Sequence, residues 1–417
     1  MNKPTDIETL YIDFDAFFAN IEKQLDPALH TRPVGITALN SEHSVLITCC
    51  YQAKTAGVKR GMRVLEARKL CPEIVIRQAR PDIYVDIHNQ ILAEVNRHVP
   101  ITKVWSIDEV ECSLIGSERA RPKDLAVRIR DGLTRNIGSL ITPSIGLGPN
   151  QFLAKVAAEM DKPRGLIMLH PDHLPGPLLD LSLTKLPGIS ANMETRLHAA
   201  GITTVFDLWN ISAKHARKIW GNVEGERLWS ELHGYRIVRP ATQKRMFGHS
   251  RVLSGEFKAP ARAIDCLHLL TVKAAFRLRR AEFLSGALSI SIRPTNAPRW
   301  HGEQRFPPAN DDFTFVRHMR QLYHDGLGAL GHPRSLKGTS VMLHALTRRE
   351  NLAYDMFESE DMSSKQVHFD KLMQVMDGLN MKHGRAICHV GTRAQLPGGY
   401  AGAKIAFGRV PDKEDFY

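Results

Sequence analysis

The sequence lacks the features that would assign it to several common protein classes. No Cys-x-x-Cys pair occurs among its six cysteines, so neither a zinc cluster nor a disulfide framework is indicated. No apolar run approaches the roughly 20 residues that a membrane-spanning helix needs. The first residues contain no apolar signal core, and low-complexity tracts and repeats of fixed period are absent. We therefore expect a cytoplasmic protein without a membrane anchor.

Length and composition indicate a multidomain globular protein. The chain has 417 residues, of which 43% are hydrophobic and 24% are charged, and this excludes intrinsic disorder as its main state. A single compact domain seldom reaches such a length. We therefore expect about two to four domains.

Positive charge is concentrated in one segment. Lys and Arg outnumber Asp and Glu by 56 to 44, a net charge of +12. Residues 241–350 contain 18 Lys and Arg against 8 Asp and Glu, which is +10 of that total. A basic segment beside a nearly neutral remainder is typical of a protein that binds a polyanion, above all nucleic acid. A solvated basic face without a partner is the alternative that charge alone leaves open.

Apolar periodicity predicts alternating strands and helices up to about residue 169, which indicates a mixed α/β domain. Residues 10–14 alternate like a half-buried strand and place Asp13 near its end, and a helix follows. Short helices broken by Pro and Gly are expected between 170 and 236, and a linker over 237–248. Strands and helices return over 249–347, where 263–284 is the longest helix candidate. The tail, 348–417, contains a further predicted helix over 369–381.

Three carboxylates lie in apolar strand surroundings. Asp13 closes the first predicted strand, and the pair Asp108-Glu109 lies in a later β segment, 101–114. Buried carboxylates are costly unless they are paired or bind a metal, and three oxygen ligands without His or Cys favour Mg²⁺ or Mn²⁺. Surface carboxylates on an edge strand are the alternative. Because strand neighbours point to opposite faces, Asp108 and Glu109 can share a metal only at a bulge, a twist or a strand end.

Four short motifs follow one another along the chain. They read YIDFDAFFA at 11–19, YQAK at 51–54, SIDE at 106–109, and FLAK at 152–155 with KPRG at 162–165. In this order and spacing, through roughly residues 8–250, they resemble the Y family of translesion DNA polymerases, in particular its bacterial UmuC/DinB-like branch. The resemblance makes the surface-carboxylate alternative much less favoured.

The resemblance implies a multidomain α/β fold in the form of a right-hand polymerase. Its parts would be a ferredoxin-like palm (1–16 and 80–169), small fingers (17–79), and a helical thumb with a helix-hairpin-helix (170–236). A linker (237–248), an α/β little finger (249–347) and a C-terminal tail (348–417) would follow. The expected protein is a monomer that binds primer–template DNA and dNTPs.

The resemblance also implies roles for individual residues. Asp13, Asp108 and Glu109 would be catalytic and bind two Mg²⁺ ions, for which Mn²⁺ can substitute, with the backbone carbonyl of Phe14 as a further ligand. Phe18 would be the steric gate beneath the sugar, next to Phe17 in the substrate site, although a plain core aromatic would show the same helical spacing. The incoming triphosphate would be held by Tyr51, Lys54 and Lys162, because a phenol and two ammonium groups suit phosphate oxygens.

The sequence departs from the family at three positions. Lys54 stands where many relatives have Arg, so a single point charge replaces a bidentate fork. Ile47 is larger than the residue usually found under the nascent base pair, which predicts narrower lesion tolerance. Glu111 is an additional acid to which the sequence assigns no role.

The expected grip on DNA has two parts. Leu186-Pro187-Gly188-Ile189 resembles a helix-hairpin-helix, whose backbone N–H groups bind phosphate around Gly188. Ser190 replaces the usual second Gly, and an ordinary packing corner is the alternative. In the basic segment, phosphate contacts are expected from Arg251, Arg277 and Arg280, together with Arg293 and Arg299. Arg279, on the same predicted helix, is a further candidate, but it points away from the face of Arg277 and Arg280, so at least one of these three is expected to be a solvated charge.

Residues 353–357 occupy the place of a clamp-binding pentapeptide and keep only its Phe, with Met for Leu. Binding to the sliding clamp and chance resemblance both remain open. The implied function is low-fidelity, template-directed translesion synthesis during DNA damage tolerance, the SOS response and mutagenesis, since no acidic cluster is left for proofreading. A non-catalytic polymerase-like adaptor and another palm-type transfer such as cyclisation are the alternatives. The three acids oppose an adaptor, and Tyr51, Phe18 and the basic segment oppose a cyclase.

Overall fold

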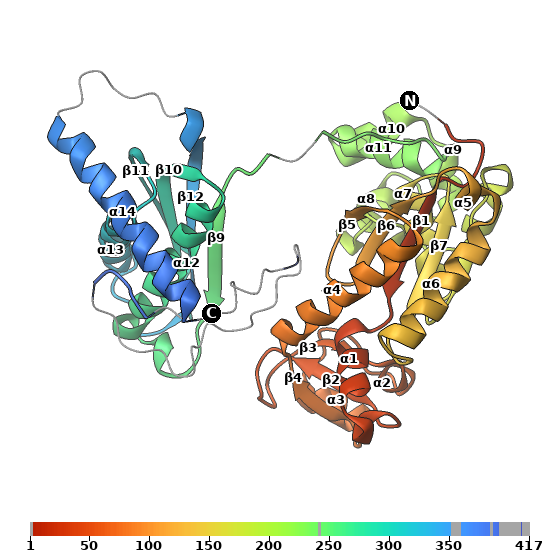
Figure 1. Ribbon diagram of the computed structural model, residues 1–417, viewed down its shortest axis with the longest axis horizontal. Helices are drawn as coiled ribbons and strands as arrows, with labels where there is room; N and C mark the ends of the chain where they lie inside the picture. The colour runs from red at the N-terminus through yellow and green to blue at the C-terminus, as the bar shows by residue number, and fades with distance from the viewer. Residues whose placement is uncertain (1–2, 241–242, 352–359, 384–386, 392–409, 411–417) are drawn as a thin grey trace. The chain divides into compact units, whose positions relative to one another are not determined.

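The structure is a computed structural model that describes residues 3–240, 243–351, 360–383, 387–391 and 410. The described residues form two compact units, one up to Pro240 and the other from residue 243 to 391 (Figure 1). No helix within these ranges is both long and apolar enough to span a bilayer. The candidate clamp-binding segment, 353–357, lies outside the described residues.

A five-stranded sheet forms the centre of the first unit. Its order is β5-β6-β1-β7-β8, and β1 pairs antiparallel with both β6 and β7. Every residue of β1 is buried, because this strand lies in the middle of the sheet. The strands are β1 (Thr9–Phe14), β5 (Ile101–Val104), β6 (Glu109–Ser113), β7 (Pro143–Gly148) and β8 (Leu166–Met168).

Helices cover both faces of this sheet. Leu10 and Ile12 of β1 share a core with α4 (Pro81–His98) and α6 (Pro122–Asn136) on one face. Tyr11 points to the other face and packs on α7 (Gln151–Met160). Residue Gly146 of β7 allows α7 to lie close, because a Cβ there would be 1.9 Å from the carbonyl oxygen of Ala154. Asp13 alternates with Ile12 and therefore faces α7.

A small sheet and a group of helices complete the first unit. The sheet has the order β3-β2-β4 and shares its core with the larger sheet. Its strands are β2 (Val34–Thr37), β3 (Leu46–Cys49) and β4 (Val75–Gln78), with α1 (Phe17–Leu25), α2 (Tyr51–Thr55) and α3 (Val64–Leu70). A separate core joins α7 to α8 (Ala191–Ala199), α9 (Val205–Asn210), α10 (Ala213–Trp220) and α11 (Val223–Leu232). The short helix α5 (Ser117–Ala120) precedes α6.

The second unit is a four-stranded antiparallel sheet with helices packed on its apolar face. The sheet order is β11-β10-β12-β9. Its strands are β9 (Phe247–Val252), β10 (Phe283–Pro294), β11 (Trp300–Ala309) and β12 (Leu336–Arg348). They share one core with α12 (Pro260–Arg280) and α13 (Asp312–Ala329). As predicted, the longest helix within residues 249–347 is the one near 263–284, although α12 begins and ends a few residues earlier than expected. A further helix, α14 (Glu360–Lys382), includes the helix predicted over 369–381.

Of the three arginines on α12 considered for phosphate contacts, Arg279 is the one that the structure buries. Its side chain is only 10% exposed and contacts both α13 and α14. The guanidinium donates to Asp312 Oδ1 at 2.7 Å and to both carboxylate oxygens of Asp377 at 2.7 and 2.8 Å. Burial alone would lower the pKa of Arg279, but the two carboxylates outweigh it and raise that pKa. Helical periodicity cannot reveal such partners, since α14 is nearly 100 residues further along the chain.

We expect Arg279→Met to destabilise the second unit by about 2–3 kcal/mol, because two partly buried carboxylates would lose their counterion. Urea titration followed by hydrogen exchange in α12 measures this effect separately from the first unit. Arg280→Met is the matched control, since Arg280 is exposed on the same helix. Equal unfolding midpoints for the two variants would contradict the prediction.

Candidate active site

A cavity of about 810 Å³ in the first unit brings together most of the predicted site residues. Its walls come from the end of β1, the β5–β6 turn, the starts of α1 and α2, and the end of α7. Predicted residues that line it are Asp13, Phe14, Phe17, Phe18, Ile47, Tyr51, Lys54, Asp108, Glu109 and Lys162.

The three predicted carboxylates meet at one wall of the cavity. Asp13 on β1 is directly opposite Glu109 on β6, so the two residues lie side by side on adjacent strands. Asp108 precedes β6, and its carbonyl oxygen accepts a hydrogen bond from Phe14 N at 2.9 Å. The strand end therefore resolves the difficulty that neighbouring strand residues face opposite ways.

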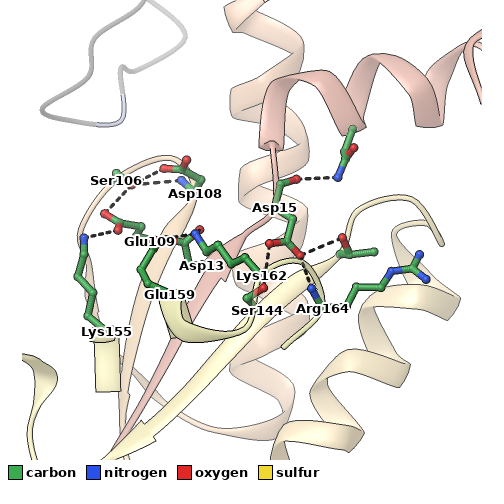
Figure 2. A network of polar contacts seen from close by, with 12 residues as sticks. Asp13, Asp15, Ser106, Asp108, Glu109, Ser144, Lys155, Glu159, Lys162 and Arg164 are labelled. Carbon is green, nitrogen blue, oxygen red and sulfur yellow. Dashed lines mark hydrogen bonds and ion pairs between the residues drawn. The ribbon is translucent and has the colours of Figure 1, made fainter. Parts of the chain in front are cut away.

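Polar contacts hold these carboxylates in place (Figure 2). Ser106 Oγ lies 2.5 Å from Asp108 Oδ1 and 3.3 Å from Glu109 Oε2, and it thus bridges the two acids. Lys155 of α7 pairs with Glu109. Lys162 Nζ lies 2.5 Å from Asp13 Oδ1 and therefore neutralises the acid on β1.

Burial makes Asp13 and Asp108 reluctant to carry charge without a cation nearby. Asp13 is 6% exposed, and burial raises its pKa well above the ordinary value although Lys162 opposes the shift. Burial also raises the pKa of Asp108, against the hydrogen bond from Ser106. For Lys162, burial lowers the pKa, but Asp13 and Glu159 outweigh it and raise the pKa overall. The site therefore favours bound positive charge.

The donor set fits hard divalent cations, because it consists of carboxylate oxygens with no thiol or imidazole. Within the described part of the chain, no three His, Cys, Asp or Glu side chains are grouped closely enough to hold a metal ion. The ammonium groups of Lys155 and Lys162 supply the positive charge at Glu109 and Asp13.

An aromatic ring and further cations also line the cavity. Phe18 is 9% exposed, and its ring stacks on Tyr84 with centroids 4.6 Å apart. Lys54 Nζ lies 3.9 Å from the centre of the Tyr51 ring. Burial, followed by nearby charges, raises the pKa of Tyr51 to about 12, so its hydroxyl stays protonated and can donate a hydrogen bond.

Several residues of the site were not predicted from the sequence. Lys155 and Asp15 stand inside the recognised motifs, but the motifs alone did not assign them roles. Ser106 also lies in a motif, shortly before Asp108 and Glu109. This closeness in sequence was the signal that its hydroxyl could contact both acids. Glu111, left without a role, accepts a hydrogen bond from Trp105 Nε1 at 2.8 Å and so braces the β5–β6 hairpin.

The residues predicted to contact DNA lie elsewhere in the chain. Gly188 is exposed in the turn before α8 and has a φ of +89°, a conformation that favours glycine. In the second unit, Arg277 is half-buried with its guanidinium 3.2 Å from His249 Nε2, and Arg280 is exposed. Arg251 differs, since it is only 6% exposed and lies beside Cys266. Such burial does not suit the predicted contact between Arg251 and a DNA phosphate.

Comparison with known proteins gives consistent matches. The model of the impB/mucB/samB family matches residues 12–159. DNA polymerase IV of Moorella thermoacetica is 32% identical over 328 residues, which cover 76% of this chain and 81% of that protein. DNA polymerase IV of Treponema denticola is 26% identical over 384 residues, covering 90% and 94% of the two chains.

Solved structures show the same fold at lower identity. A Y-family DNA polymerase chimera aligns with a TM-score of 0.70 at 21% identity, over 82% of this chain and 99% of that chain. DinB from Sulfolobus solfataricus aligns with a TM-score of 0.53 at 22% identity, over 81% and 98% of the two chains.

Proposed function

The chain belongs to the Y family of DNA polymerases, as a homologue of bacterial DNA polymerase IV, and from this premise we propose that it copies damaged templates with low fidelity by two-metal nucleotidyl transfer. The enzyme is a DNA-directed DNA polymerase of mixed α/β fold with several sheets. The observation that carries the proposal is the cavity of about 810 Å³. Three carboxylates, an aromatic ring and several cationic side chains all line it.

We assign the parts of a right hand to the observed elements. The five-stranded sheet with α4 and α6 would be the palm, and the small sheet with α1 to α3 would be the fingers. Helices α8 to α11 would form the thumb, and the four-stranded sheet with α12 and α13 the little finger. This assignment follows the boundaries that the resemblance implies.

The catalytic acids would be Asp13, Asp108 and Glu109. Their carboxylates, with the carbonyl of Phe14, would hold two Mg²⁺ or Mn²⁺ ions. When bound, such ions lower the pKa of the attacking hydroxyl and stabilise the charge on the leaving pyrophosphate. Ser106 keeps Asp108 and Glu109 oriented, and burial withdraws Asp13 from bulk water.

The nucleotide would be bound by other residues that line the cavity. Tyr51 offers a protonated hydroxyl, and Lys54 and Lys162 offer ammonium groups to the triphosphate oxygens. Phe18 would lie beneath the sugar and exclude a 2′-hydroxyl, with Phe17 beside it. Ile47 lines the same cavity.

Changing Lys54 to Arg is expected to lower the KM for dNTP by about threefold to tenfold, because a planar guanidinium binds phosphate through two hydrogen bonds. Steady-state insertion of a single nucleotide measures this KM. Lys59→Arg is the control, since Lys59 is exposed and does not line the cavity. If Lys54→Arg leaves the KM for dNTP unchanged or raises it, the predicted phosphate contact of residue 54 is contradicted.

Most contacts with DNA would be made by residues that do not line the cavity. The turn at Gly188 offers backbone N–H groups to a phosphate, and Arg277, Arg280, Arg293 and Arg299 add positive charge on the second unit. Each phosphate contact on duplex DNA would steepen the salt dependence by a slope of about −0.9. Binding of residues 353–357 to a sliding clamp stays a proposal made from the sequence alone.

Primer extension tests the proposed function. The purified full chain, a primer–template, Mg²⁺ and four dNTPs should give extended primers, and a template with an abasic site or bulky adduct should be copied past the lesion. Binding of primer–template without any extension, even with Mn²⁺ or added clamp, would instead favour a non-catalytic adaptor. Nucleotide cyclisation without primer use would favour another palm-type transferase.

A further inference from the structure

We propose that Asp15 is a positioning residue for nucleotide binding, because its carboxylate fixes the loop that carries Lys162. This inference rests on the proposed role of Lys162 as a triphosphate ligand. Asp15 lies behind the cavity wall and not on it, whereas Asp13 and Lys162 both line the cavity. Any effect of Asp15 on the nucleotide would therefore act through its neighbours.

Asp15 is a buried acceptor at the junction of three segments (Figure 2). It is 1% exposed. Its carboxylate accepts hydrogen bonds from Ser144 Oγ at 2.8 Å and Thr142 Oγ1 at 3.2 Å, both at the start of β7. It also accepts a hydrogen bond from Arg164 N at 2.9 Å. One carboxylate thus ties the β1–α1 turn to β7 and to the 162–165 loop.

The hydrogen bond from Arg164 supports an unusual backbone conformation. Arg164 has a φ of +64°, in the left-handed region that residues other than glycine seldom adopt. The loop is also held by Arg130, which donates to the carbonyl oxygen of Gly165 at 2.7 Å, and by a contact of Arg164 with the carbonyl oxygen of Ser139 at 3.3 Å. The contact with Asp15 differs from these two, because its carboxylate accepts a hydrogen bond from the backbone amide of Arg164, the residue with the strained conformation.

Two acids on one segment thereby meet two basic residues on the other. Asp13 pairs with Lys162 through an ion pair of 2.5 Å, and two residues further along each segment Asp15 accepts from the amide of Arg164. The first contact faces the cavity and can open when substrate arrives. The second contact is buried and fixes the backbone of the 162–165 loop. Lys162 therefore keeps one position relative to the cavity.

A double-mutant cycle tests this coupling. The variants are Asp15→Ala, Asp15→Asn, Lys162→Met and the two combined pairs, all in the full-length chain, and the readouts are kcat and KM for single-dNTP insertion. Asp15→Ala should raise the KM about tenfold and Asp15→Asn about threefold, because a neutral amide accepts a weaker hydrogen bond. In both, kcat should change less than the KM. In the Lys162→Met background, either change at Asp15 should alter the KM by less than about twofold.

Matched measurements keep the outcomes distinct. Asp161→Asn is the control, since Asp161 is an exposed acid next to the same loop, and it should leave the KM unchanged. If Asp15→Ala does not fold, the near-isosteric Asp15→Asn carries the cycle. Hydrogen exchange should then rise in the 162–165 loop and not in β1.

Additive effects of the two sites, or an unchanged KM in folded Asp15 variants, would overturn the inference. Absence of primer extension by the unmodified chain would instead refute the proposed function.

Discussion

Primer extension should fall by at least about 1000-fold when Asp108→Asn and Glu109→Gln are combined, the largest effect expected for this enzyme. Both side chains line the cavity, and their loss removes two of three carboxylates proposed to hold the metal ions. A bound metal ion stabilises the charge of the transition state by several kcal/mol, and about 1.4 kcal/mol corresponds to a factor of ten in rate. Single-turnover insertion with saturating dNTP and Mg²⁺ measures the loss directly.

The fold should survive this double change. Burial raises the pKa of Asp108, so the folded protein disfavours the charged form and a neutral amide of the same shape carries no additional penalty. Thermal unfolding without metal should therefore occur at a similar or slightly higher temperature. Glu111→Gln is the control, because it removes a charge from the same strand while its amide oxygen can still accept from Trp105. Extension by the double variant at the rate of this control would refute the metal role of the two acids.

Ribonucleotide insertion should rise by about 100-fold in Phe18→Ala. The ring is held rigidly, because it stacks on Tyr84, whose hydroxyl donates to Glu22 Oε1 at 2.8 Å. Arg80 in turn binds both oxygens of Glu22. A rigid ring cannot move aside for a 2′-hydroxyl, and overlap of this kind costs about 3 kcal/mol. The ratio of kcat/KM for rNTP and dNTP measures the discrimination.

Two further variants separate the sugar gate from a structural role of the ring. Phe18→Leu keeps most of the buried volume and should relax discrimination less than Phe18→Ala. Tyr84→Phe keeps the stacked ring and removes only the hydrogen bond to Glu22, so it should retain most of the discrimination. If Phe18→Ala inserts dNTPs normally and still rejects rNTPs, Phe18 is a plain core aromatic.

Much of the candidate site could be predicted from the sequence alone. Asp13 could be placed near a strand end because residues 10–14 alternate, and the motifs at 51–54, 106–109 and 162–165 named residues that do line one cavity. These predictions succeeded because each depends on local periodicity or on a short segment. The same local patterns indicated an α/β chain with a basic C-terminal half.

Contacts between distant segments were beyond the sequence. Lys155 meets Glu109, and Asp15 meets Arg164, only because α7 and the loop after it return to the end of β1. The sequence could not show which of the arginines on α12 is paired, because the partners of Arg279, Asp312 and Asp377, come from two later helices. Arg251 looked accessible, yet it is buried.

What the sequence determined by itself is therefore the family, the acidic and aromatic residues of the site, and the segment that bears the positive charge. The tertiary structure decided which charges are solvated and which are paired, and which residues hold the proposed catalytic residues in place. The physical reason is that periodicity shows the side on which a residue lies along its own element. Desolvation and pairing depend instead on which other element covers that side.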